Sequence, residues 1–254
     1  MTLNMEPGGE EGIIRPMKGK RDPFVGPDAL MVIVPSELDY LIKITEAKEV
    51  VFSEMGLYRL YQTECRANVP ITLCGPFLGA PHAVIAMEKL IVLGAERIWV
   101  LGWCGSLQPE LRIGHILVPT GAISEEGTSP HYPLGAISPE SDKRLNQMLE
   151  KELGRKGFPF SKGAVWTTDA IYRETPSKVK TYQARGILAV EMEISALMTV
   201  ALYRAVSMAG LLVVSDELFD LKWRHGFSNP QLKEGSRAAG KALLDLASSC
   251  SQAI

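Results

Sequence analysis

Short, unbroken apolar runs alternate along this chain with segments of helical periodicity, and this alternation constrains the fold more than any other feature. The apolar runs span residues 31–34, 69–74, 97–101, 114–119, 164–166, 187–190 and 210–214. Helical spacing of apolar residues covers 38–51, 81–93, 145–153, 193–206 and 232–246. Strands that are apolar on both faces are typical of parallel sheets whose helical connections cover them. The pattern therefore predicts an α/β fold: a single domain with a mainly parallel, mixed and twisted central sheet, flanked by helices on both faces.

The first 28 residues differ from the rest of the chain, because they are rich in glycine, proline and charge. Such composition predicts an N-terminal arm over residues 1–28 that runs across the surface of a domain formed by residues 29–254. The arm lacks the apolar centre of a signal peptide, and no window approaches the roughly 18 apolar residues of a membrane span. We expect no membrane partner.

Charge and cysteine content exclude several function classes. The net charge is −2, so no basic face for nucleic acid is expected. The four cysteines show no metal-ligand spacing, and Cys74 and Cys104 lie in apolar runs as expected for buried thiols. We therefore expect reduced cysteines, a cytoplasmic location, no metal and no organic cofactor.

Two carboxylates stand where an apolar run gives way to a helical pattern. Val190 is followed by Glu191, Met192 and Glu193. Open α/β sheets bind ligands at the ends of their strands, and ionised carboxylates accept hydrogen bonds from vicinal hydroxyls such as those of ribose. The alternative is that both acids complement the dipole at the start of a helix. The sequence leaves both interpretations open, although a dipole role does not readily explain two acids that leave a buried strand.

Two further motifs end apolar runs. Asp216 follows Ser215 at the end of the 210–214 run, where a partly buried carboxyl group can act as a general acid or simply cap a turn. The segment 102–106 reads Gly-Trp-Cys-Gly-Ser, and its Gly105 would let backbone N–H groups approach a ligand or merely form a tight turn.

In their order and spacing these motifs resemble the purine nucleoside/uridine phosphorylase family, which also contains nucleosidases. The resemblance covers about residues 29–250 and is carried by 190–193 and 214–216, with weaker support from 79–81, 102–106, 114–118 and 168–169. It implies two catalytic residues. Glu193 would hold the ribose 2′ and 3′ hydroxyls, and Asp216 would protonate the departing base.

The resemblance also implies the substrate-binding residues around these two. Met192 would pack on the sugar, and Glu191 would support the same edge of the ribose that Glu193 holds. Trp166 stands where the family often has an aromatic residue under the base, and Arg173 lies near the position that reads uracil. Gly105 and Ser215 complete the implied site.

The half of the site that should bind phosphate departs from the family pattern. In the loop after the first strand, Ser36 replaces a glycine and Tyr40 replaces an arginine. Val100 stands where a second arginine is usual, and Trp103 replaces a small hydroxyl residue. A phosphate dianion would therefore need cations from elsewhere.

Three hypotheses about function follow. The first is phosphorolysis of a nucleoside to free base and ribose 1-phosphate, with phosphate as the co-substrate and cations recruited from Arg173, Arg224 or the arm. The second is a nucleosidase in which Glu37 or Glu191 activates water. The third is a non-catalytic nucleoside-binding protein, although retention of an acid at Asp216 argues against it. The nominal prediction is phosphorolysis, and the resemblance implies a homo-oligomer, either a dimer or a hexamer.

Overall fold

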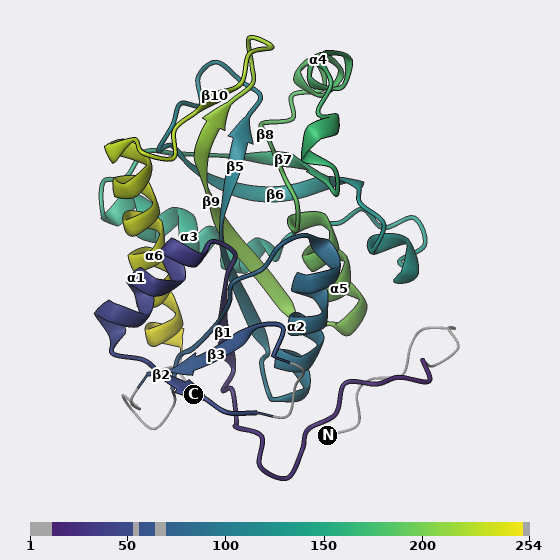
Figure 1. Ribbon diagram of the computed structural model, residues 1–254, viewed down its shortest axis with the longest axis vertical. Helices are drawn as coiled ribbons and strands as arrows, with labels where there is room; N and C mark the ends of the chain where they lie inside the picture. The colour runs from purple at the N-terminus through teal and green to yellow at the C-terminus, as the bar shows by residue number, and fades with distance from the viewer. Residues whose placement is uncertain (1–11, 53–55, 64–69, 251–254) are drawn as a thin grey trace.

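A mixed sheet of ten strands forms the centre of the computed structural model, which describes residues 12–52, 56–63 and 70–250 (Figure 1). The strand order is β10-β9-β6-β7-β8-β5-β1-β4-β3-β2, and β9 pairs with β5 as well. This extra pairing closes β5, β9, β6, β7 and β8 into a ring. The strands are β1 (Asp28–Val32), β2 (Lys48–Val50), β3 (Arg59–Gln62), β4 (Thr72–Gly75), β5 (Arg97–Ser106), β6 (Ile116–Glu125), β7 (Phe160–Thr168), β8 (Ala189–Glu191), β9 (Ser207–Glu217) and β10 (Arg224–His225).

Parallel ladders hold the middle of this sheet. Strand β1 is parallel to β4 and β5, β5 is parallel to β9, and β7 is parallel to β6 and β8. Antiparallel ladders add the edge strands β2, β3 and β10, and they also join β5 to β8 and β6 to β9. The predicted mixed α/β sheet is confirmed.

Helices cover both faces of the sheet, as the sequence predicts (Figure 1). Helices α2 and α5 pack against each other in one apolar cluster, while α1, α3 and α6 share the cluster on the opposite face. Over the described residues, no helix combines the length and apolar character that crossing a membrane requires. The helices are α1 (Pro35–Thr45), α2 (Ala80–Val92), α3 (Lys143–Arg155), α4 (Pro176–Ala184), α5 (Ile194–Arg204) and α6 (Pro230–Cys250).

The helix predicted over 38–51 is wrong in its second half. Helix α1 ends at Thr45, because Glu46 adopts a left-handed conformation with φ 54° that stops the helical ladder. The next residues form the short edge strand β2, which pairs with β3. Tertiary pairing therefore overrides the apolar spacing on which the longer helix was predicted.

The described part of the N-terminal arm is tied to helix α2. Asp22 and Lys89 form a buried ion pair with a 2.9 Å separation, and the backbone N–H of Val25 donates to the carbonyl of Leu93. Residues 12–27 have no regular structure before β1 begins at Asp28. The division into an arm (1–28) and a domain (29–254) stays a prediction, and residues 1–11 lie outside the described residues.

Candidate active site

The predicted acids meet through strand register at one end of the sheet. Gly105 of β5 pairs with Asp216 of the parallel strand β9 and with Val190 of β8. Because β8 runs antiparallel to β5, its last residue Glu191 reaches this region from the opposite direction. The charges of Asp216 and Glu191 both raise the pKa of Cys104, so both carboxyl groups lie near this thiol. The structure thus brings together two motifs that are 25 residues apart in the chain.

Gly105 has no room for a side chain. A methyl group at this position would lie 2.5 Å from Leu218 Cδ1, 3.2 Å from Asp216 Oδ2 and 3.3 Å from Val190 Cγ1. These separations are shorter than ordinary van der Waals contacts. A side chain at this position would therefore push Asp216 and the β8 strand apart.

Glu191 is buried and holds the start of helix α5. Its Oε2 accepts hydrogen bonds of 2.6 Å from the backbone N–H groups of both Glu193 and Ile194, and its Oε1 accepts from the hydroxyl of Thr167. Burial raises the pKa of Glu191 to about 7, although these three donors favour its ionised form. The geometry supports the helix-start role that the sequence left open. Contact between Glu191 and a sugar stays a prediction.

Glu193 is equally buried but has a different environment. Its Oε1 accepts a 2.7 Å hydrogen bond from the backbone N–H of Gly79, which directly precedes α2 and has a φ of 80°. Burial raises the pKa of Glu193 to about 8, the charge of Glu191 adds to this, and the backbone donors of Gly79 and Met192 oppose it. Glu193 therefore keeps its proton to higher pH than an ordinary glutamate does, and a positive charge nearby would favour its ionised form.

Asp216 is half-buried, and each of its oxygens has a donor. The hydroxyl of Ser215 donates to Oδ1 at 2.6 Å, and the indole N–H of Trp223 donates to Oδ2 at 2.9 Å. Burial raises the pKa of Asp216 despite these two donors and the nearby His225. Asp216 therefore keeps a proton to higher pH than an ordinary aspartate, as a general acid requires.

Glu174 is a second carboxyl group beside Asp216 that the sequence analysis missed. It follows the short 3₁₀ helix Ile171–Arg173, in the connection between β7 and α4. Burial raises the pKa of Glu174 to about 7, and the charge of Asp216 adds to this rise. Nothing in the local sequence identifies Glu174, because its proximity to Asp216 depends on how the connection between β7 and α4 folds. The neighbouring Arg173 is exposed.

Trp166 lies in the core. Its side chain is fully buried, its indole N–H donates to Glu125 at 3.0 Å, and its ring centroid lies 4.6 Å from that of Tyr182. A contact with a base would require this packing to open. The aromatic ring that stands exposed beside Asp216 belongs to Trp223.

The loop that departs from the family's phosphate motif is acidic and lies against helix α6. Glu37 in the first turn of α1 is buried, and burial raises its pKa, while Ser36 and the charge of Arg237 oppose the rise. The guanidinium of Arg237 lies 4.7 Å from the ring centroid of Tyr40. An exposed cation from α6 thus lies over the residue that replaces the loop arginine.

Trp103 and Arg224, two other residues considered for the phosphate side, each have a partner within the protein. The indole N–H of Trp103 donates to the hydroxyl of Ser236 on α6 at 3.0 Å, which fixes Trp103 against that helix. Arg224, one of the cations predicted to replace the missing arginines, is ion-paired with Asp220. The sequence analysis did not single out Arg237.

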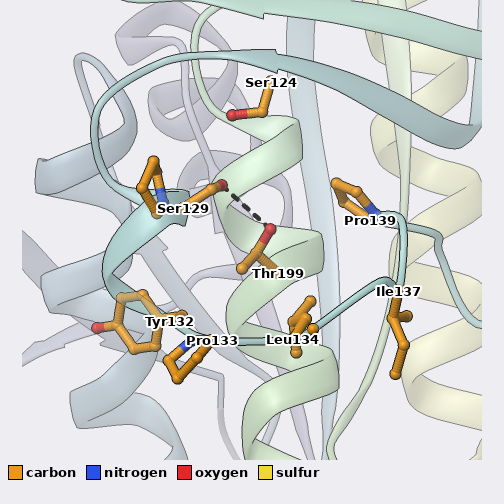
Figure 2. Close-up of a pocket in the computed structure, with 10 residues that line it drawn as sticks. Ser124, Ser129, Tyr132, Pro133, Leu134, Ile137, Pro139 and Thr199 are labelled. Carbon is orange, nitrogen blue, oxygen red and sulfur yellow. Dashed lines mark hydrogen bonds between the residues drawn. The ribbon is translucent and has the colours of Figure 1, made fainter.

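Two surface hollows lie against helices α5 and α2. One of about 420 Å³ is bounded by the loop over 129–139 and by helix α5, where the hydroxyls of Ser129 and Thr199 are 3.1 Å apart (Figure 2). Another of about 510 Å³ lies beside the N-terminal end of α2 and includes Pro81 and His131. Neither hollow has Glu191, Glu193 or Asp216 in its lining.

Comparison with known proteins shows the family to which the chain belongs. The profile of the Phosphorylase superfamily matches residues 27–248, so the chain belongs to that superfamily. The chain is 28% identical to a guanosine phosphorylase of Halorubrum lacusprofundi over 80% of this chain and 83% of that protein. It is 25% identical to a uridine phosphorylase of Escherichia coli over 73% of this chain and 80% of that protein.

A solved structure shows the same fold. The purine nucleoside phosphorylase of Toxoplasma gondii, in complex with immucillin-H, superposes with a TM-score of 0.82. The superposition covers 94% of this chain and 100% of that chain at 23% identity. The resemblance inferred from the sequence motifs is confirmed.

Proposed function

We propose that the protein cleaves the N-glycosidic bond of a nucleoside by phosphorolysis, releasing the free base and ribose 1-phosphate. Membership of the superfamily and similarity to guanosine and uridine phosphorylases support this reaction class. The observation that carries the proposal is that the strand register brings the end of β8, which buried Glu193 follows, next to Asp216 of β9, and that each acid has a raised pKa. The reaction requires no cofactor beyond the co-substrate phosphate.

Glu193 would bind the sugar. An ionised carboxylate can accept hydrogen bonds from both the 2′ and the 3′ hydroxyl of ribose. As the bond to the base breaks, the sugar gains positive charge, and this charge favours the ionised form of Glu193. The attraction is therefore stronger in the transition state than with the bound substrate, which is the condition for accelerating the reaction.

Asp216 would act on the base. The C1′–N bond breaks with its electron pair moving to the base, and the carboxyl proton of Asp216 passes to a base nitrogen, which for a purine is N7. An oxygen of phosphate then bonds to C1′. Because burial raises the pKa of Asp216, its carboxyl group keeps the transferable proton to higher pH than an ordinary aspartate does. Glu174 adds a second carboxyl group beside Asp216, which could accept a hydrogen bond from an N–H group of the base.

Arg237 is our proposed phosphate contact. It lies over Tyr40 and interacts with Glu37, so it is placed at the loop whose arginine is missing. A guanidinium can bind two phosphate oxygens at once, which a lysine or a serine cannot do. Helix α6 would thus supply the charge that the loop after β1 lacks.

Hydrolysis is the competing function, and the replaced arginines favour it. However, the geometry of Glu191 argues against a role as base for water, because its two oxygens already accept three hydrogen bonds. Pure nucleoside binding would not explain an acid with a raised pKa at Asp216.

We also propose a homo-oligomer, a dimer or a hexamer. Leu78 and Ile85 at the start of α2 are 76% and 46% exposed, beside the hollow of about 510 Å³, and such apolar surface is typical of subunit contacts. The buried, free thiols of Cys74 and Cys104 are compatible with the cytoplasmic location that we propose.

The test is a panel of purine nucleosides and uridine, each incubated with the purified protein with and without phosphate while base release is followed. We expect release from a purine nucleoside only when phosphate is present. Release that does not depend on phosphate would favour hydrolysis, and release from no nucleoside would favour a binding protein.

A further inference from the structure

The segment after β9 returns over the candidate acid. The chain leaves β9 at Glu217, turns through Leu221 in a left-handed conformation with φ 64°, and comes back as β10. In this hairpin His225 pairs with Asp216. Trp223, which directly precedes β10, is thereby placed beside the carboxyl group of Asp216.

Trp223 is held there by a polar contact although its ring is largely in solvent. The side chain is 62% exposed, yet its indole N–H lies 2.9 Å from Asp216 Oδ2. Burial of apolar surface therefore contributes little to fixing this ring. Neighbouring rings flank it, with centroids 5.5 Å away at His225 and 6.2 Å away at Phe227. Phe227 in turn stacks on Trp103 at 6.1 Å.

The two donors to Asp216 differ in what they can do. An indole N–H can only donate, so it binds best to an oxygen that carries no proton. A serine hydroxyl can donate or accept, and the hydroxyl of Ser215 lies 2.6 Å from Asp216 Oδ1 and 3.3 Å from the carbonyl oxygen of Cys104. When Asp216 is protonated, Ser215 can accept the proton of Oδ1 and donate to Cys104, whereas Trp223 has no such alternative.

From this asymmetry we infer that Trp223 is a positioning residue for Asp216: it fixes Oδ2 as the unprotonated oxygen and so places the transferable proton on Oδ1. The inference rests on the proposed function. Trp223 also sets the orientation of the carboxyl group, since the bond from its indole prevents rotation. Departure of the base is assisted from Oδ1, on the side of Ser215.

Removing the indole N–H has a defined effect on acidity. The other groups that face Asp216 are Glu174 from the β7–α4 connection, Cys104 from β5 and His225 from β10. The Trp223 bond favours the ionised form of Asp216, so its loss raises the pKa of Asp216 further. Activity that needs the protonated acid falls as pH rises through this pKa. Without the indole N–H, that fall moves to higher pH.

The kinetic test compares Trp223→Phe, which keeps a ring but has no N–H, with Phe227→Leu, which disturbs the hairpin without touching Asp216. With a cleaved purine nucleoside we expect Trp223→Phe to lower kcat about 10-fold, to leave KM within about 2-fold, and to move the high-pH fall of kcat upward. Phe227→Leu keeps the wild-type pH profile. A wild-type profile for Trp223→Phe, or the same upward shift in Phe227→Leu, would overturn the inference.

A second measurement needs no activity. Tryptophan fluorescence of the full chain is titrated with pH for wild type, Trp223→Phe and Asp216→Asn. The difference between wild type and Trp223→Phe should show a transition that disappears in Asp216→Asn. If that transition is absent, Trp223 does not respond to the ionisation of Asp216, and the inference is wrong. If the transition is present and no nucleoside is cleaved, the contact stands and the proposed function fails.

Discussion

The two sides of the candidate site are built in different ways. On the nucleoside side, Glu191 and Glu193 are buried and bonded to backbone N–H groups at the starts of two helices. On the phosphate side, the corresponding groups lie on the facing surfaces of α1 and α6, where Arg237 covers Tyr40. Acids that hold helix starts cannot change without disturbing the fold. A cation on the surface can instead be supplied by a different helix. This difference accounts for a nucleoside side that keeps the family pattern and a phosphate side that departs from it.

Asp216→Asn should give the largest loss on the nucleoside side. An amide of the same shape cannot donate an acidic proton, so we expect kcat for a purine nucleoside to fall by roughly 10²- to 10⁴-fold. Nucleoside binding, measured by calorimetry, should change little. Full activity in this variant would show that the acid lies elsewhere.

Glu193→Gln should impair both binding and turnover. Hydrogen bonds to a charged acceptor are worth about 1.5–3 kcal/mol each, so the loss in kcat/KM is expected to be on the order of 100-fold. Steady-state kinetics over a range of nucleoside concentrations would measure it. A change confined to the KM for phosphate would place Glu193 on the wrong side of the site.

The same variant should become more stable than wild type at high pH. The folded-state pKa of Glu193, about 8, lies above its ordinary value of 4.5. Stability contributed by this group is therefore complete below pH 4.5 and is lost as pH rises through 8. Glutamine cannot ionise, so the Tm difference in favour of Glu193→Gln should grow between pH 5 and pH 9. A Tm difference that does not change with pH would contradict a buried Glu193 carboxyl group with a raised pKa.

Arg237→Ala tests the phosphate side. We expect the KM for phosphate to rise about 10-fold while the KM for the nucleoside stays constant, because one charge-assisted contact is lost. Lys233→Ala, which removes a cation one turn earlier on α6, is the matched control and should leave both constants unchanged. If the two substitutions changed the KM for phosphate equally, Arg237 would act only through the general charge of the surface and not as a specific phosphate contact.

The last comparison concerns folding stability and distinguishes Glu191 from Glu193. Glu191→Ala leaves three buried donors without an acceptor, whereas Glu193→Ala leaves two, the backbone N–H groups of Gly79 and Met192. Each such donor costs about 1–3 kcal/mol, so Glu191→Ala should lower the free energy of unfolding more. Urea denaturation of both variants at pH 7 would measure the difference. A larger loss for Glu193→Ala would reverse the roles assigned here.

Much of the fold could be predicted from the sequence, because apolar runs and helical spacing are local signals. The end of α1 and the edge strands could not, since β2 depends on pairing with β3 and not on its own residues. Glu193 and Asp216 stand out because each lies within three residues of the end of an apolar run. Glu174, Trp223 and Arg237 do not, because each reaches the site only through the folding of a connection or the packing of a distant helix.

The most direct test of the account is the identity of the sugar product. The purified protein, a cleaved purine nucleoside and inorganic phosphate are followed by ³¹P NMR while base release is measured in the same sample. Phosphorolysis predicts one molecule of ribose 1-phosphate for each molecule of base, with an equal loss of inorganic phosphate. Base release with an unchanged phosphate signal would contradict the account and establish hydrolysis in its place.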